Sequence, residues 1–219
     1  MLYATYAAFI IVSYLLGSVP FGLLLTKWMG KGDIRKIGSG SPGATNVSRV
    51  AGISGFIITW VLDMGKAILA FMLAKSFLGA NFGALCGAIA VVGHIFPVWM
   101  KFKGGKGLAP MFGFMLALNP IVFATQGLIW LLVAISSGYS SAGALAVLVF
   151  LPVFGFAIGF WAGIICIFLT LVGLWAHRLN IKRLWDGEES KMQLKLGKLA
   201  LALILVGLLA VGLMIYLNA

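Results

Sequence analysis

Long apolar segments alternate with short polar segments along this chain of 219 residues. No charged side chain occurs before Lys27, and the later apolar runs cover about 53–78, 80–100, 108–176 and 199–217. Because a helix needs about 20 apolar residues to cross a bilayer, each run is long enough for at least one membrane-spanning helix. The pattern therefore predicts an all-α, polytopic helical bundle embedded in a membrane.

The longest apolar run, 108–176, has no charge and is interrupted at Asn119-Pro120, Ser136-Ser137-Gly138 and Leu151-Pro152. It could hold two long or four short helices, and either even number returns the chain to the side that it left. We expect about seven transmembrane helices in a membrane domain of residues 1–198. The run 199–217 predicts an additional C-terminal transmembrane helix within residues 199–219.

Composition supports a membrane protein and changes the meaning of its positive charge. Hydrophobic residues make up 62% and charged residues 10% of the chain, whereas soluble domains average about 25% charged. The 16 Lys and Arg exceed the 5 Asp and Glu, but they lie almost entirely between the apolar runs. Anionic headgroups or a small anionic substrate are therefore better partners than nucleic acid. The cysteines, Cys86 and Cys166, are typical of small core residues.

The placement of cations predicts the topology. Four of them, Lys27, Lys31, Arg35 and Lys36, follow the first apolar run, which is the reverse of a secretory signal. The positive-inside rule then places the N-terminus outside and residues 27–50 in the cytoplasm. Counting crossings from there brings three polar segments, 31–50, 101–107 and 177–198, to the cytoplasmic face. This convergence of distant segments is the central prediction from the pattern.

The middle polar segment, Lys101–Gly107, reads K-F-K-G-G-K-G. Glycines allow a sharp turn whose successive N–H groups can bind an anion, and lysines beside them supply positive charge. A basic loop that only determines topology is the equally weighted alternative. The segment does not match the Walker A pattern, because Gly107 follows Lys106.

The first polar segment contains G-S-G-S-P-G-A-T-N-V-S-R, from Gly38 to Arg49. It satisfies G-x-G-x-x-G, but a membrane helix precedes it instead of a strand, so we reject a dinucleotide site. What remains is a tight loop with hydroxyls such as Ser39, the amide of Asn46 and the guanidinium of Arg49. Arginine can bind phosphate through two parallel hydrogen bonds.

The third polar segment begins at His177, and His177, Asn180 and Arg183 recur at a spacing that places them on one helix face. That face offers one imidazole, one amide and one cation. An amphipathic helix bound to anionic lipid is an alternative of equal weight.

Two charges, Asp63 and Lys66, occur three residues apart inside an apolar run. Charges inside a membrane are costly and usually paired or functional, so mutual neutralisation and a pair beside a site remain open. His94 near the end of the next run is more typical of a hydrogen-bonding residue in helix packing. No set of His, Cys and carboxylates has the spacing of a metal site.

Taken together, the three segments resemble the acyl-phosphate-dependent glycerol-3-phosphate acyltransferase family of the PlsY type. The resemblance rests on Gly38–Arg49, on G-H-I-F-P-V-W-M-K-F-K-G-G-K-G from Gly93 to Gly107, and on H-R-L-N-I-K-R-L-W-D-G-E-E-S-K from His177 to Lys191. It covers residues 1–191. Ser41 stands where the family usually has Asn, and the run 199–217 extends beyond the family's usual end.

The resemblance implies transfer of a fatty acyl group from acyl phosphate to the sn-1 hydroxyl of glycerol 3-phosphate. The products would be lysophosphatidic acid and phosphate, at the cytoplasmic face of a bacterial inner membrane among membrane lipids. It implies no cofactor, metal, nucleotide or acyl-CoA. An organic-phosphate transporter is the main alternative, and a lipid-binding scaffold protein is a third class.

The resemblance implies a role for each expected site residue. Arg49, Lys103, Lys106 and His177 would bind the phosphates, and Ser39, Asn46 and Asn180 would orient them. The backbone N–H groups of Gly104 and Gly105 would line the anion site. Arg183 would contact substrate, and Glu189 would hold the third segment by pairing with a basic loop. The general base is either His177 or a substrate phosphate oxygen.

Overall fold

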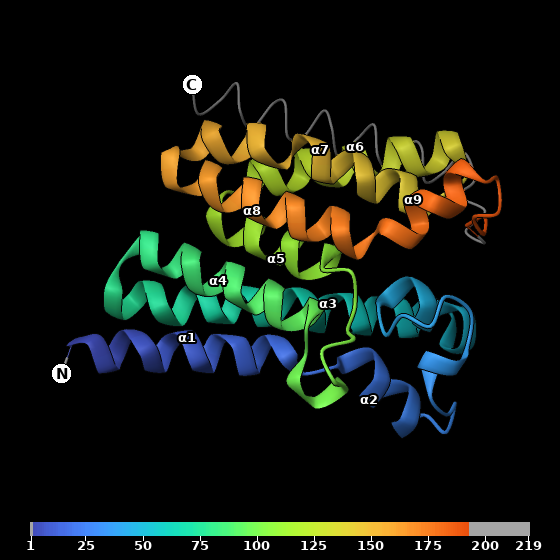
Figure 1. Ribbon diagram of the computed structural model, residues 1–219, viewed down its shortest axis with the longest axis horizontal. Helices are drawn as coiled ribbons and strands as arrows, with labels where there is room; N and C mark the ends of the chain where they lie inside the picture. The colour runs from blue at the N-terminus through green and yellow to red at the C-terminus, as the bar shows by residue number, and fades with distance from the viewer. Residues whose placement is uncertain (1, 193–219) are drawn as a thin grey trace.

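The computed structural model describes residues 2–192 and contains no strand in that range (Figure 1). Its elements are α1 (Leu2–Ser18), α2 (Phe21–Trp28), η1 (Ile34–Lys36), α3 (Ala44–Leu78), α4 (Ala80–Ile95), η2 (Val98–Met100), α5 (Leu108–Leu118), α6 (Pro120–Ser137), α7 (Ser140–Ile158), α8 (Phe160–Ala176) and α9 (Arg178–Trp185). The all-α fold expected from the hydrophobic pattern is confirmed. The additional C-terminal helix and the domain boundary expected at 198/199 lie outside the described residues.

Several helices are long and apolar enough to cross a membrane. Among the described residues four qualify alone, namely α3, α4 with its extension to Met100, α6 and α7. The bent pairs α1 with α2 and α8 with α9 raise the number to six if each pair is one span. The short apolar helix α5 is an addition to these. The protein is therefore a multi-pass membrane protein, and the expected count of seven spans remains a prediction.

The uncharged run 108–176 forms four helices. Asn119 begins α6 by accepting hydrogen bonds from the N–H groups of Ile121 and Val122, with Pro120 in the first turn. Gly138 ends α6 in a left-handed conformation with φ of 80°. The break expected at Leu151-Pro152 is wrong, because Pro152 lies inside α7 and the chain turns later, at Gly159.

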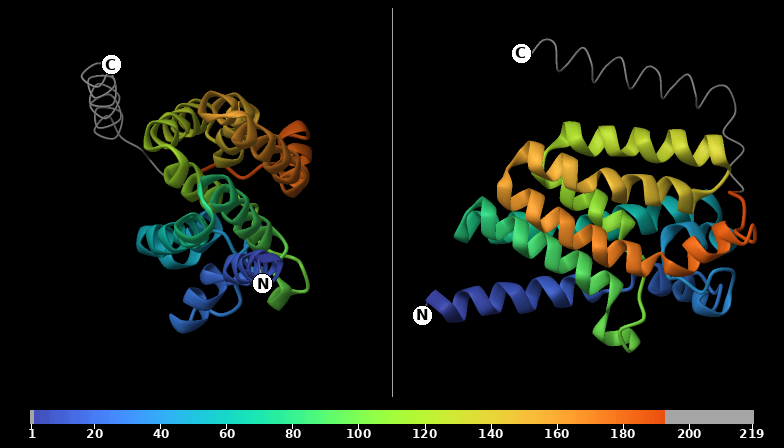
Figure 2. Two further views of the ribbon diagram at one scale, coloured as in Figure 1. Left: turned by 90° about the vertical axis from the view of Figure 1, so that its left-hand side faces the viewer. Right: turned by 45° about the horizontal axis from the view of Figure 1, so that its top comes forward.

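The helices pack in layers, with α1, α3 and α4 on one side of α5 and α6 to α8 on the other (Figures 1 and 2). Small residues bring α1 and α4 together: a Cβ built on Gly17 would lie 2.1 Å from the carbonyl oxygen of Ala90. The Tyr14 hydroxyl donates to the carbonyl oxygen of Phe96 at 2.6 Å, which ties α1 to the end of α4. This contact anchors the start of the glycine-rich loop that follows.

A break in helical geometry divides α3 at Gly52, where φ is 65° and ψ is −162°. The apolar run begins at the next residue, Ile53. The turns before the break carry Asn46 and Arg49, and the turns after it carry Asp63 and Lys66. One helical element therefore supplies polar side chains at the end of the bundle and a charged pair deeper inside it.

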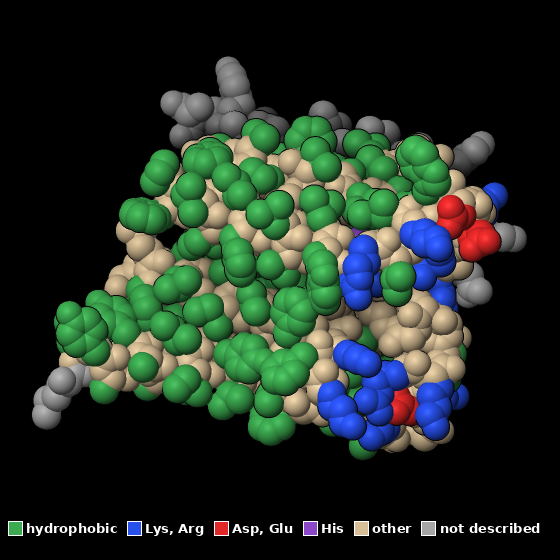
Figure 3. Space-filling view, viewed as in Figure 1, with side chains coloured by type: hydrophobic (Ala, Val, Ile, Leu, Met, Phe, Trp, Pro, Cys, Tyr) green, Lys and Arg blue, Asp and Glu red, His purple; other side chains and the backbone are tan. Residues whose placement is uncertain are grey.

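The polar segments gather at one end of the bundle. The α2–η1 region, the loop after α4, and α9 all lie at the same end in Figure 1. On the face shown in Figure 3, Lys and Arg side chains cluster at that end, and hydrophobic side chains cover the rest. The convergence predicted by counting crossings is confirmed in this arrangement.

Candidate active site

A cavity of about 870 Å³ lies where the three polar segments meet. Seven of the eleven site residues expected from the sequence line it: Ser39, Asn46, Arg49, Lys106, His177, Asn180 and Glu189. The other four, Lys103, Gly104, Gly105 and Arg183, are not among its lining residues. The cavity also extends between α3, α5 and α6, where its walls are largely aromatic and aliphatic.

Asn46 organises the loop that carries Ser39. Its side-chain Nδ2 donates to the carbonyl oxygens of Ile34, Ile37 and Ser41 at 3.2, 2.8 and 2.9 Å. Its Oδ1 accepts from the N–H of Ser39 at 3.1 Å. Because the amide is already engaged inside the loop, the expectation that it orients substrate phosphate is corrected to a role in shaping the site.

Arg49 connects the first and third polar segments. Its guanidinium donates to the Ser190 hydroxyl at 2.6 Å, and its side chain lies against Gly38. The chain beyond Ser190 is held to the α6–α7 turn, because the N–H of Met192 donates to the carbonyl oxygen of Gly138 at 2.8 Å. Residues 189–192 all line the cavity, so this segment borders the guanidinium and the polar end of the cavity.

The glycine-rich loop folds back onto the end of α4. The N–H of Gly104 donates to the carbonyl oxygen of Ile95 at 3.0 Å, and the N–H of Gly105 donates to that of His94 at 3.1 Å. The two N–H groups expected to bind an anion are thus engaged, because they cap the last carbonyl groups of α4. This expectation is wrong. Lys103 in the same loop is exposed and outside the cavity.

Lys106 is the cation that this loop directs into the cavity. Burial is the largest cause that lowers its pKa to about 8, and the nearby positive charges of Arg183 and Arg49 lower it further. The carboxylate of Glu189 acts in the opposite direction. Several cations held together in a partly dehydrated cavity repel one another, so the arrangement favours an anionic ligand between them.

The third polar segment is held together from within. Glu189 Oε2 accepts from Asn180 Nδ2 and from Arg183 Nε, both at 3.1 Å. The expected pairing of Glu189 with a basic loop is corrected: its ion pair is with α9 of its own segment. Asn180 is buried, and its Oδ1 has no hydrogen-bond partner in the described part of the protein. That oxygen is therefore free to accept a hydrogen bond from a ligand.

His177 lies at the bend between α8 and α9, and it is only 3% exposed. Its Nδ1 lies 2.8 Å from the carbonyl oxygen of Gly173. A carbonyl oxygen only accepts, so Nδ1 carries the proton and Nε2 presents its lone pair. Burial lowers the pKa of His177 to about 4, and Lys106 lowers it as well. With Nδ1 protonated, Nε2 is left as a hydrogen-bond acceptor, and the expected place of His177 beside the phosphates stays a prediction.

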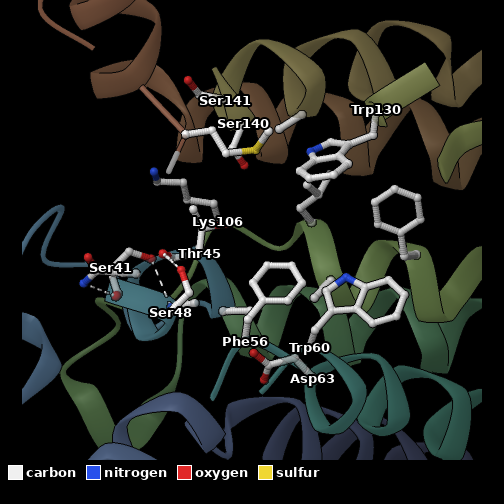
Figure 4. Close-up of a pocket in the computed structure, with 18 of the residues that line it drawn as sticks. Ser41, Thr45, Ser48, Phe56, Trp60, Asp63, Lys106, Trp130, Ser140 and Ser141 are labelled. Carbon is white, nitrogen blue, oxygen red and sulfur yellow. Dashed lines mark hydrogen bonds between the residues drawn. The ribbon is translucent and has the colours of Figure 1, made fainter. Parts of the chain in front are cut away.

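Side chains that the motifs did not point to complete the cavity. Ser140 and Ser141 at the start of α7 line its polar side, and Ser141 Oγ is buried without a partner among the described residues. Trp60 and Trp130 line the opposite side (Figure 4). The serine pair was visible as polar residues inside an apolar run. No sequence signal distinguished these two tryptophans from other membrane aromatics.

A protein-family model described as Glycerol-3-phosphate acyltransferase matches residues 7–187. The chain belongs to this family. A glycerol-3-phosphate acyltransferase of Rhizobium etli strain CFN 42 is 43% identical over 187 residues, which cover 84% of this chain and 90% of the relative. One from Rhodopseudomonas palustris strain HaA2 is 44% identical over 196 residues, which cover 88% and 98%. The family resemblance of the three motifs is thereby confirmed.

Two solved structures share the fold of this acyltransferase. Both are crystal structures of PlsY, an integral membrane glycerol 3-phosphate acyltransferase, one in a glycerol 3-phosphate form and one in a lysophosphatidic acid form. The TM-scores are 0.81 and 0.78, and each match has 31% identity and covers 85% of this chain and 95% of the other. The membrane helical bundle is therefore the architecture of the family.

Proposed function

We propose that this acyltransferase moves a fatty acyl group from acyl phosphate to the sn-1 hydroxyl of glycerol 3-phosphate. The observation that carries the proposal is a single cavity with a cationic, hydrogen-bonding end and an apolar end. Glycerol 3-phosphate needs only the first end, and a donor with both a phosphate and a long chain needs both. The solved relatives hold glycerol 3-phosphate in one structure and lysophosphatidic acid in the other, which are a substrate and a product of this reaction.

The polar end suits two phosphates. Arg49 and Lys106 supply charge that is partly shielded from water, where electrostatic stabilisation is strongest. Ser39 and the free Oδ1 of Asn180 orient the glycerol hydroxyls and phosphate oxygens. Holding both substrates in one cavity also turns a bimolecular reaction into one between positioned groups.

In the proposed step, the sn-1 oxygen attacks the acyl carbonyl carbon, and the bond from that carbon to the phosphate oxygen breaks. The phosphate leaves with the electron pair of that bond. Nε2 of His177 accepts the hydroxyl proton, since His177 lines the cavity and Nε2 carries no proton of its own. The negative charge of the two substrates beside His177 raises its proton affinity in the complex. The departing phosphate then takes the proton.

The apolar end suits the acyl chain. Trp60 and Phe112 have ring centroids 6.3 Å apart, and Phe112 and Phe123 have centroids 5.9 Å apart. Figure 4 shows Lys106 on one side of the cavity and Trp60 and Trp130 on the other, with Phe56 between them. The carbonyl would lie near Lys106 and the end of the chain near the two tryptophans.

Shortening a tryptophan at that end should change the preferred length of the acyl chain. We expect Trp60→Ala to raise the ratio of kcat/KM for an 18-carbon over a 14-carbon acyl phosphate by about tenfold, since each buried methylene contributes about 0.8 kcal/mol. Kinetics with donors of graded length measure the ratio. Trp161→Ala is the matched control, because Trp161 is 61% exposed and outside the cavity. An equal ratio in both variants would place the chain elsewhere.

We also propose that the cavity faces the cytoplasm, with the N-terminus outside, in a bacterial inner membrane. The clustering of Lys and Arg at the cavity end supports this orientation. In intact cells, a membrane-impermeant thiol reagent should label Lys75→Cys, at the opposite end of α3, but not Lys103→Cys. Both positions are exposed, and the buried Cys86 and Cys166 would be replaced by alanine first. Labelling of Lys103→Cys from outside would reverse the orientation.

The proposed reaction is tested with purified protein in detergent, supplied with acyl phosphate and glycerol 3-phosphate. We expect equal amounts of phosphate and acylated glycerol 3-phosphate, with no acyl transfer when acyl-CoA replaces acyl phosphate. Activity with acyl-CoA alone would identify a different donor. Uptake of glycerol 3-phosphate into vesicles without product would indicate a transporter instead.

A further inference from the structure

Three ionisable side chains form a buried cluster beneath the cavity. Lys66 Nζ lies 2.9 Å from Asp63 Oδ1 within α3, and His94 Nδ1 of α4 lies 3.4 Å from the same oxygen. The side chains of Lys66, Asp63 and His94 are 1%, 2% and 7% exposed. Asp63 and His94 both line the cavity, but neither belongs to the groups assigned to the phosphates or to the proton.

The cluster also holds the break between α1 and α2. Lys66 Nζ donates to the carbonyl oxygen of Val19 at 3.1 Å, and it lies 5.8 Å from the centre of the Phe21 ring. Val19 follows the last residue of α1, where carbonyl oxygens lack partners in the helix. Lys66 therefore contacts Val19 and Phe21 in addition to Asp63. Because Lys66 already balances the charge of Asp63, charge balance gives no reason for His94 to be there.

The imidazole of His94 supports the glycine-rich loop. A Cβ built on Gly105 would lie 2.0 Å from His94 Nε2, and its three nearest atoms would all belong to that ring. The loop backbone is bonded to the same residue, through the N–H of Gly105 and the carbonyl oxygen of His94. Lys106 is the next residue. The ring thus lies directly under the backbone that directs Lys106 into the cavity.

We propose that Asp63 and His94 are positioning residues: the carboxylate orients the imidazole, and the imidazole holds the loop so that Lys106 faces the substrate phosphates. Lys66 neutralises Asp63 and holds the α1–α2 break against the same cluster. The inference rests on the proposed function, because it concerns the cation that the function requires. A loop that moves by about 1 Å can cost roughly a hundredfold in rate, so such support matters for catalysis.

The contact predicts compensation between two substitutions. Gly105→Ala alone should lower kcat at least about tenfold, because the added methyl group collides with the ring and displaces Lys106. His94→Ala should also lower kcat by about tenfold, because the loop loses its support. In the double variant the methyl group occupies the space of the ring, so kcat should be no lower than in His94→Ala.

Gly104→Ala is the matched control for this cycle. A Cβ on Gly104 would collide with the backbone oxygen of His94, at 2.1 Å, and with the Pro97 ring, at 2.4 Å. Removing the His94 imidazole relieves neither collision, so the loss caused by Gly104→Ala should persist in the His94→Ala background. Compensation in both pairs, or multiplying losses in the Gly105 pair, would overturn the proposal.

A second pair of variants tests Asp63 without leaving a buried charge unpaired. Asp63→Asn with Lys66→Met keeps an oxygen for His94 Nδ1, whereas Asp63→Leu with Lys66→Met removes it. We expect kcat of the leucine pair to be about tenfold below that of the asparagine pair, at equal thermal stability in detergent. Equal kcat values would mean that Asp63 only balances the charge of Lys66 and does not position His94.

The pH profile gives a readout that a general loss of folded protein would not change. Lys106 must be protonated to bind phosphate, and its pKa is lowered to about 8 by burial, with Arg183 and Arg49 adding to the effect and Glu189 opposing it. A displaced, more hydrated Lys106 has a higher pKa, so the alkaline decline of kcat/KM should move to higher pH in Gly105→Ala. An unchanged decline would oppose the proposal. Absence of product from the unmodified protein would instead contradict the proposed function.

Discussion

Replacing Lys106 with methionine should lower kcat/KM for glycerol 3-phosphate by about 10³-fold. The methionine side chain is of similar length but carries no charge, and the transition state of acyl transfer places negative charge on the carbonyl oxygen and on the leaving phosphate. Because Lys106 lies in the cavity wall and is only partly exposed, water replaces the lost charge poorly. Steady-state kinetics with both substrates varied would measure the loss.

Folding should not explain that loss. Lys106 is close enough to Arg49 and Arg183 for their charges to lower its pKa, so removing its charge relieves repulsion. The thermal stability of Lys106→Met in detergent should equal or exceed that of the unmodified protein.

Lys103→Met is the matched control, since it removes a lysine of the same loop that is exposed and outside the cavity. Its kcat/KM should stay within about twofold, as for a screened surface charge. Equal losses in the two variants would indicate that the net charge of the loop, and not the position of Lys106, determines binding.

The sequence alone does not distinguish the roles of Lys103 and Lys106. The segment K-F-K-G-G-K-G contains three lysines, and composition gives no reason to prefer Lys106 over Lys103. The difference arises because the loop caps the carbonyl groups of α4, which turns Gly104 and Gly105 inward and directs only Lys106 into the cavity. The hydrogen bonds from Gly104 and Gly105 to the end of α4 join residues close in sequence. Which way the loop then faces depends on where α4 ends, and the sequence did not specify that residue.

Asn46 gives a second example. A glycine-rich loop with hydroxyls and one amide could be recognised as polar and tightly turned, and the sequence predicted that much. Which group binds substrate and which holds the loop depends on the four hydrogen bonds that Asn46 makes to residues 34–41. A buried backbone group left unpaired is costly, so the loop uses the amide before any ligand does.

The convergence of the three polar segments was predictable because membranes restrict topology. Each apolar run must cross and each charged segment must remain at a surface, so parity alone places distant segments together. Parity gives no angles or distances. The aromatic end of the cavity could therefore not be predicted, since Trp60 and Trp130 come from helices whose relative rotation no periodicity specified.

Replacing His177 with alanine should lower kcat by about 10²–10³-fold, while KM for glycerol 3-phosphate changes little. The reason is the tautomer: Nδ1 is committed to the carbonyl oxygen of Gly173, so Nε2 is an acceptor with no proton to hold a phosphate. Turnover at saturating concentrations of both substrates measures kcat. Because the side chain is 3% exposed, alanine leaves a space that added imidazole can enter, and imidazole should restore part of the rate.

Arg178→Ala is the control for His177, because Arg178 is the adjacent residue in sequence, stacks on Trp175 with 4.0 Å to the ring centre, and does not line the cavity. It should leave kcat within about twofold, as is usual for an exposed surface position. If His177→Ala turns over at a near-normal rate, a phosphate oxygen of one of the substrates accepts the hydroxyl proton. In that case the protein contributes only position and charge. Arg49 and Lys106 would then stabilise the transition state without proton transfer to His177.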